Sequence, residues 1–113
     1  MIAENTQTQM RKGILEYCIL SIIGREETYA SDIIAELKKA QLLVVEGTIY
    51  PLLTRLKNNG LLTYNWVEST SGPPRKYYSL SPEGREALKQ LDQTWKELSF
   101  AVQTAIAKKS KNQ

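Results

Sequence analysis

The sequence contains no histidine and only one cysteine, and both shortages exclude classes of function. Without histidine there can be no Ser-His-Asp triad, no histidine general base and no histidine-containing zinc site. Cys18 alone can form neither an internal disulfide nor a site with several thiolate ligands. A lone cysteine in an apolar stretch is usually a small buried side chain, and this usage is typical of the reducing cytosol. We therefore expect a cytoplasmic protein with no metal, no cofactor and no catalytic residues.

Long apolar runs are also missing. The longest two contain four residues each, at 17–20 and 42–45, whereas a membrane-spanning helix needs about 20. The pattern predicts no membrane span and no signal peptide, and the sequence has no glycine-rich phosphate loop. Apolar residues still make up 42% of the 113 residues, which is enough for the core of one domain. The composition favours a folded module that binds a partner.

Most of the chain lacks an excess of charge of either sign. The net charge of +3 comes from 15 basic and 12 acidic side chains, but Lys108, Lys109 and Lys111 account for all of the excess. Residues 1–107 carry 12 side chains of each sign. Bulk charge therefore does not indicate a nucleic-acid partner, and any such prediction depends on where the charges lie.

Four segments have the apolar spacing of helices. Apolar side chains recur every three or four residues in 10–24, 29–40, 46–59 and from 82 to about 109. Gly24 is expected to end the first helix in a left-handed conformation, and Gly60 is expected to end the third. Thr28 or Ser31 is available to cap the second helix, and Ser81 to cap the last.

Between the third and last helices the apolar pattern alternates, as it does in strands. Residues 62–67 and 75–80 are predicted to form a hairpin, with 69–74 as its loop. Residues 42–45 either pack over the core or pair as a small strand. This order predicts a mainly α fold with a β-hairpin wing: a winged helix-turn-helix followed by a long C-terminal dimerisation helix. The expected organisation is a flexible N-terminus at 1–9, a DNA-binding domain at 10–81, a dimerisation helix at 82–107 and a basic flexible tail at 108–113.

The outer face of the third helix has the side chains that DNA recognition requires. It carries one acid, Glu46, and the predicted hairpin adds Arg75 and Lys76 with no acid between 69 and 82. Hydroxyl, amide and guanidinium groups hydrogen-bond to phosphates and base edges. A polar face on its own is more often only a solvated surface, but the order of the elements and the basic hairpin favour DNA. The outward residues are Gly47, Thr48, Tyr50, Thr54, Arg55, Lys57 and Asn58.

Two stretches resemble the PadR family of bacterial transcriptional regulators. GTIYPLLTRL at 47–56, followed by GLL at 60–62, resembles the family's recognition-helix signature. GPPRKYYSLSPEG at 72–84 resembles its wing and the start of its last helix, and RKG at 11–13 is similar to its opening. The resemblance is collinear over roughly 10–106. The short length is similar to the subgroup with a single C-terminal helix.

This resemblance implies a homodimeric repressor that binds a palindromic operator in double-stranded DNA and is released by a small ligand or a stress signal. One departure is Val45-Glu46, where the family often has Ser-Pro, and it places an acid near the DNA side. By this resemblance the DNA-binding residues are Thr48, Tyr50, Thr54, Arg55 and Asn58 in the third helix, and Gly72, Arg75 and Lys76 in the wing.

The last predicted helix carries a seam of apolar residues. Leu88, Leu91, Trp95, Leu98, Val102 and Ala105 are separated by alternating steps of three and four residues. A helix about 40 Å long exceeds what a small core can cover, so we expect a symmetric homodimer through this seam. Packing within one chain is the alternative.

In such a dimer Trp95 lies close to its own mate across the two-fold axis. Two facing indoles can bound a slot for a planar aromatic effector, with Tyr17, Asp92 and Ser99 as its polar lining. The resemblance supports this slot, since family members bind planar drugs or phenolic acids at the dimer centre. The equally weighted alternative is that Trp95 only fills the interface.

A winged-helix module that binds protein and not DNA is the main alternative function. It predicts no operator binding and a partner held by the third helix or the wing. An enzyme is not expected, because no nucleophile, base and orienting residue can be identified together.

Overall fold

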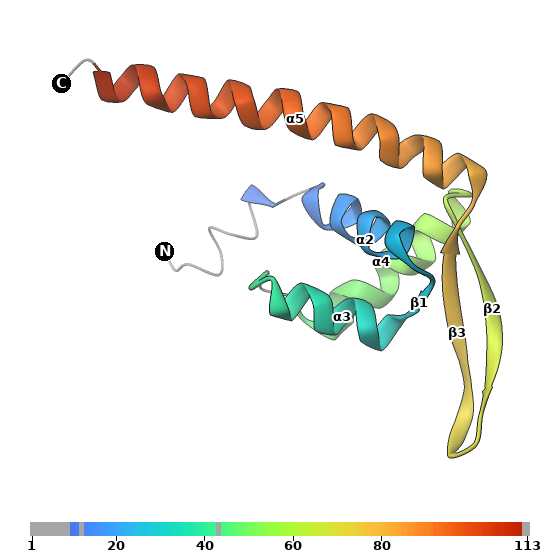
Figure 1. Cartoon of the computed structure of the whole chain (residues 1–113). Helices are drawn as coiled ribbons and strands as arrows, with labels where there is room; N and C mark the ends of the chain where they lie inside the picture. Colours follow the sequence, from blue (N-terminus) through green and yellow to red (C-terminus); the bar gives the residue numbers. More distant parts are fainter. Residues whose placement is uncertain (1–9, 12, 43, 112–113) are drawn as a thin grey trace.

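The computed structural model describes residues 10–111 except 12 and 43, with side chains described as far as 107. The predicted flexible N-terminus at 1–9 and the last two residues of the predicted tail lie outside this range. Figure 1 shows a group of short helices packed together, a hairpin projecting from them and a long helix running past them. The elements are α2 (Ile14–Arg25), β1 (Thr28–Tyr29), α3 (Ala30–Lys39), α4 (Glu46–Asn58), β2 (Leu62–Ser69), β3 (Gly72–Leu80) and α5 (Pro82–Lys111).

The core lies between α2, α3, α4 and the base of the hairpin. Its side chains recur every three or four residues in the helices, which brings them to one face of each helix. The predicted mainly α winged helix-turn-helix is therefore confirmed. The most deeply buried side chains are Ile19, Leu20, Ile23, Ile33, Leu37, Ile49 and Leu53.

Two glycines that were predicted to end helices behave differently. Gly60 ends α4 in the left-handed region at φ 81°, as predicted. Gly24 lies inside α2, which ends at Arg25, so that prediction was wrong. A Cβ at Gly24 would lie 2.9 Å from Leu88 Cδ2 and 3.1 Å from Leu80 Cδ1. Gly24 is thus the position where β3 and α5 approach α2 closely.

The sheet has the strand order β1-β3-β2 and is antiparallel. Its edge strand β1 was not predicted, and Tyr29 pairs with Tyr77 of β3. Of the two alternatives for 42–45, packing over the core is the one observed in the described residues, since Leu42 and Val44 pack against it and no strand forms there. Thr28 lies in β1 and α3 has no side-chain cap, so the predicted cap by Thr28 or Ser31 was also wrong.

The hairpin extends further than its composition suggested. Ser69 pairs with Gly72, so only two residues remain for the turn and the predicted loop at 69–74 was too long. Pro73 and Pro74 fit in β3 because the pairing is irregular between Val67 and Ser69 and because the outer edge of β3 is open beyond its short pairing with β1. The longer hairpin carries the wing away from the core (Figure 1).

Helix α5 begins at a hydrogen-bonded joint with the end of α4. The Gly84 N–H donates to Ser81 Oγ at 2.9 Å, and that hydroxyl donates to the Gly60 carbonyl at 2.6 Å. The predicted capping role of Ser81 is confirmed, and its side chain is buried. A Cβ at Gly84 would collide with the Leu61 carbonyl, so the joint has room only for glycine there. No helix in the described part of the chain is long and apolar enough to cross a membrane.

Candidate nucleic-acid interface

The outer face of α4 is polar and open to solvent. Ile49, Leu53 and Leu56 are buried on its inner face, so the polar residues between them point outward. Pro51 removes one backbone donor, and the complete burial of Ile49 and Leu53 on either side of it holds the helix in place. Of the predicted DNA-binding residues, Tyr50, Thr54, Arg55 and Asn58 are exposed and Thr48 is half-buried.

The wing holds its two cations against aromatic rings. The guanidinium carbon of Arg75 lies 3.8 Å from the centre of the Tyr29 ring, and Nη2 donates to Ser31 Oγ at 2.6 Å. Lys76 Nζ lies 4.6 Å from the centre of the Tyr64 ring and 5.5 Å from that of Trp66. Gly72, the third predicted wing residue, is exposed next to the turn. Each cation thus has a fixed place on the hairpin.

One cavity joins the wing to α4. Its volume is about 290 Å³, and three predicted residues, Tyr50, Arg75 and Lys76, contribute to its wall. The structure adds Tyr29, Ala30, Ser31 and Trp66, which the sequence had not indicated. An exposed tryptophan in a strand is the available signal for Trp66, whereas Tyr29 and Ser31 fall in the segment predicted as the second helix, Ser31 as a candidate cap.

Arg55 lies apart from this cavity. Its Nε donates to Glu16 Oε2 at 3.1 Å, which pairs the guanidinium with α2. Glu46, the acid predicted to lie near the DNA side, is exposed and borders a second hollow together with Tyr50 and Lys38. The α4 face is therefore polar with one cation held by a neighbouring carboxylate.

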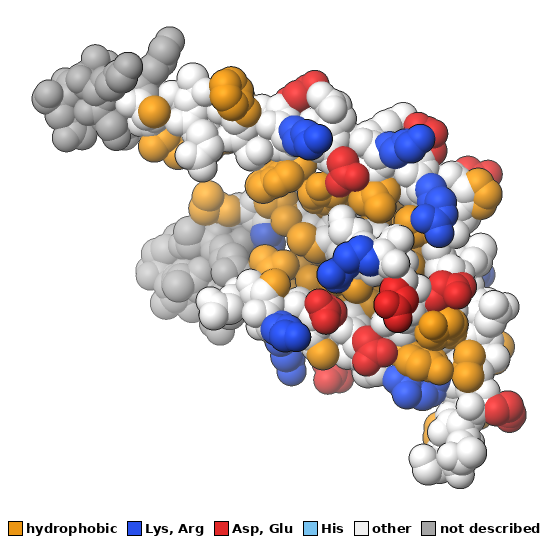
Figure 2. Space-filling view, in the orientation of Figure 1, with side chains coloured by type: hydrophobic (Ala, Val, Ile, Leu, Met, Phe, Trp, Pro, Cys, Tyr) orange, Lys and Arg blue, Asp and Glu red, His pale blue; other side chains and the backbone are white. Residues whose placement is uncertain are grey.

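The seam on α5 divides into two parts. Leu88 and Leu91 pack against the core of their own chain. Farther along, the seam is uncovered, with Leu98 54% exposed and Val102 47% exposed. Figure 2 shows hydrophobic side chains on α5 and between α5 and the helices below it. Phe100, which lies outside the predicted seam, is 73% exposed.

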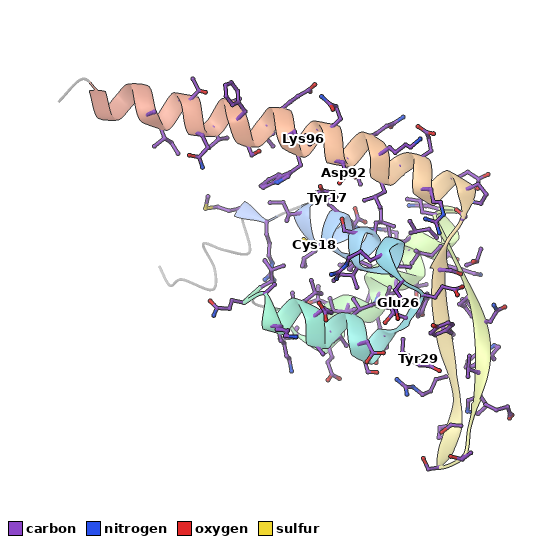
Figure 3. All side chains as sticks on the ribbon, viewed as in Figure 1. Tyr17, Cys18, Glu26, Tyr29, Asp92 and Lys96 are labelled. Carbon is purple, nitrogen blue, oxygen red and sulfur yellow. The ribbon has the colours of Figure 1, made fainter. Side chains whose placement is uncertain are left out.

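The predicted effector residues are partly brought together between α2 and α5 (Figure 3). The Tyr17 hydroxyl donates to Asp92 Oδ1 at 2.6 Å, and its ring centre lies 6.4 Å from that of Trp95. The hydrogen bond to Asp92, aided by desolvation and the carboxylate charge, raises the pKa of Tyr17 to about 12. Ser99 is directed elsewhere, since its hydroxyl donates to the Trp95 carbonyl of its own helix at 2.7 Å.

Neither thiol chemistry nor metal binding is favoured by the described residues. Burial raises the pKa of the Cys18 thiol, which disfavours the reactive thiolate. Among the described residues, no three His, Cys, Asp or Glu side chains are grouped so that they could hold a metal ion.

Comparison with known proteins identifies the family. Residues 19–90 match the model of the transcriptional regulator PadR-like family. The chain is 61% identical to a PadR-like transcription factor from Bacteroides fragilis, with 87% of this chain and 95% of that chain covered and a TM-score of 0.75. It is 40% identical to a PadR-like transcriptional regulator from Bacillus cereus, with 87% and 96% covered and a TM-score of 0.79.

A third similar structure is that of Bacillus subtilis PadR in complex with operator DNA. It is 26% identical, with a TM-score of 0.63, and the match covers 69% of this chain and 46% of that one. The family consists of transcriptional regulators and not of enzymes. The match with the family model and the collinear motifs agree, and the chain belongs to the PadR-like family of transcriptional regulators.

Proposed function

We propose that this chain is a homodimeric repressor that binds a palindromic operator through α4 and the wing and is released by a small planar aromatic ligand or a stress signal. The observation that carries the proposal is the cavity at which Tyr50, on the exposed face of α4, meets Arg75 and Lys76 of the wing. The operator complex of the Bacillus subtilis relative supports it. Such a role belongs in the cytoplasm.

The chemistry of this surface suits duplex DNA. Hydroxyl and amide groups on α4 can donate to and accept from base edges in the major groove, which admits one helix. Arg75 and Lys76 neutralise phosphates, and Gly72 beside the turn lets the backbone come close to DNA. Arg55 contacts DNA once it leaves Glu16. The proposed base and phosphate contacts on α4 are Thr48, Tyr50, Thr54, Arg55 and Asn58.

The proposed dimer uses the uncovered part of α5. Leucine and valine side chains that are about half exposed in one chain are stabilised by burial against a second copy. A two-fold dimer matches a palindromic operator, because each α4 then reads one half-site. We assign residues 10–81 to DNA binding and 82–107 to dimerisation. The proposed interface consists of Trp95, Leu98 and Val102, which are exposed, while Leu88 and Leu91, also predicted for it, pack against the core of their own chain.

The proposed effector slot lies where α5 meets α2. Trp95 supplies a flat apolar wall, and the Tyr17–Asp92 pair supplies polar groups beside it. Ser99, one turn along the helix from Trp95, is left out of the proposed slot, because its hydroxyl donates to a carbonyl of its own helix. A planar aromatic ligand between two Trp95 rings gains stacking area and can compete for the Tyr17 hydroxyl.

Fluorescence anisotropy on a duplex covering the region upstream of the gene tests the proposal. We expect saturable binding that weakens steeply between 50 and 200 mM salt, because phosphate contacts release counterions. Tyr50→Ala should weaken binding about tenfold or more, in keeping with the loss of a contact at the interface. Phe100→Ala is the matched control, since this exposed aromatic lies about 140° around α5 from Trp95. Equal affinity of the Tyr50 variant and the wild type would contradict the assignment of α4.

A further inference from the structure

The cavity between α4, the wing and the start of α3 has the composition of a site for one anion. We propose that it seats a single phosphate of the DNA backbone, bound by Arg75, and that Tyr29 and Ser31 are positioning residues that hold the Arg75 guanidinium in place. The inference rests on the proposed DNA binding and deepens it. It assigns a ligand to the cavity and a role to two residues outside the recognition helix.

Charge is segregated around α3 in a way that favours an anion at this cavity. Its wall carries two cations, Arg75 and Lys76, and no carboxylate. Of the acids near α3, Asp32 and Glu36 line a different hollow together with Glu26 and Glu27, and Glu46 borders a neighbouring hollow together with Lys38. The wing side of α3 is therefore positive although the chain up to residue 107 is neutral overall. A phosphate entering the cavity meets cations and hydroxyl groups.

Arg75 is held by two contacts that leave most of its donors available. Its guanidinium carbon lies 3.8 Å from the centre of the Tyr29 ring, within cation–π distance, and one nitrogen donates to Ser31 Oγ at 2.6 Å. A guanidinium has five N–H donors in a rigid fork, so the remaining ones can bind phosphate in a bidentate manner. Because the side chain is already ordered, less conformational entropy is lost on binding.

The sheet in turn holds Tyr29. Strand β1 pairs Tyr29 with Tyr77, and the two ring centres are 4.9 Å apart. Tyr77 is two residues from Arg75 on β3, so both side chains lie on the same face of that strand. The two-residue strand β1 thus has a functional consequence: it places an aromatic ring under the cation. The volume of about 290 Å³ equals that of about ten water molecules, which is room for a phosphate group and its waters.

Salt dependence distinguishes a bound phosphate from general attraction. The probe is a fluorescein-labelled duplex enriched from random DNA with the full-length protein. Arg75→Gln should lower the slope of log affinity against log salt by about 2, since each phosphate contributes about 0.9 and a dimer has two cavities. Lys89→Gln removes the same charge from the exposed surface of α5 and should leave the slope within about 0.5 of the wild-type value. Equal slopes for Arg75→Gln and wild type would overturn the phosphate site.

The positioning role of Ser31 predicts a loss of affinity without a change in the salt slope. Ser31→Ala keeps the charge, so the slope should stay at the wild-type value while affinity falls about tenfold for a dimer, in line with one modest hydrogen bond lost in each chain. Ser31→Thr retains a hydroxyl and should restore the affinity. Ser79→Ala is the matched control, because it removes an exposed hydroxyl bond to Thr63 on the same hairpin. Wild-type affinity in Ser31→Ala, or no rescue by Ser31→Thr, would overturn the positioning role.

Tryptophan emission reports directly on whether the cavity is occupied. The chain has two tryptophans, so Trp95→Phe leaves Trp66 in the cavity wall as the sole reporter. Its emission should change on adding the duplex, and Arg75→Gln in the same background should reduce that change at equal saturation. If the wild type binds no duplex, the proposed DNA binding fails. A second outcome is that the wild type binds the duplex, but the Trp66 emission does not change and the salt slope of Arg75→Gln equals that of the wild type. In that case only the phosphate site fails.

Discussion

Replacing Ser81 by alanine should destabilise the joint between the DNA-binding domain and the long helix. The Ser81 hydroxyl accepts from the Gly84 N–H at 2.9 Å and donates to the Gly60 carbonyl at 2.6 Å. Only 6% of this residue is exposed, so water cannot replace both partners in the variant. Alanine therefore leaves a buried helix N–H and a partly buried carbonyl without the bonds they have now.

The magnitude follows from these two bonds. Loss of a serine N-cap costs about 1 kcal/mol. Leaving the partly buried Gly60 carbonyl without its donor adds about 1 to 2 kcal/mol. We therefore expect the free energy of unfolding to fall by about 2 to 3 kcal/mol per chain, which lowers the melting temperature by about 10 °C for a chain of this length.

Urea unfolding followed by circular dichroism measures this loss, at one fixed protein concentration because dimerisation contributes to apparent stability. Ser79→Ala is the control, since its hydroxyl bond to Thr63 is exposed and its loss should change stability by less than about 0.5 kcal/mol. Equal unfolding curves for the Ser81 and Ser79 variants would refute the reasoning that the joint is held by these bonds.

Three further predictions concern the dimer, α4 and the tyrosine of α2. Leu98→Glu should give monomers in sedimentation velocity, because it places a charge in the exposed seam. The control Thr104→Glu, on the opposite side of α5, should leave the protein dimeric. Dimers in both variants would exclude this interface. Glu16→Gln should free the α4 arginine and raise DNA affinity about threefold in the anisotropy assay; a lower affinity would mean that the ion pair serves binding. Tyr17 should ionise near pH 12 in an absorbance titration, and Asp92→Asn should shift this ionisation toward pH 10. Since the folded-state pKa of Tyr17 is raised, its bond to Asp92 stabilises the fold fully below pH 10 and that stabilisation is lost as the pH rises toward 12; an unshifted titration in the Asp92 variant would contradict the bond.

Much of the fold follows from local patterns in the sequence. The three- and four-residue spacing predicted α2 to α5, because burial of one helix face imposes that period. The helix end at Gly60 and the cap at Ser81 are predicted correctly because each of these two roles acts within one turn of its own helix. Gly24 is not, because its role is close packing against Leu80 and Leu88, which are more than 50 residues away in the chain.

The candidate site was harder to predict for the same physical reason. Tyr50, Arg75 and Lys76 were found from residue type and from the family resemblance. Tyr29 and Ser31 were not, because β1 is a two-residue strand that exists only through its pairing with β3. The pairing of Arg55 with Glu16 joins residues 39 positions apart, and no spacing rule indicates it. The sequence thus predicts the surface, while long-range pairing determines the geometry of its cations.

A hydroxyl-radical footprint on the upstream region tests the central proposal most directly. A two-fold dimer that places α4 and the wing on each half-site should protect two equivalent patches on one face of the duplex, with centres one helical turn or a multiple of it apart. Arg75→Gln should weaken protection in both patches alike, because the two chains make the same contacts. A single patch, or uniform cleavage at protein concentrations that saturate the anisotropy signal, would contradict the account.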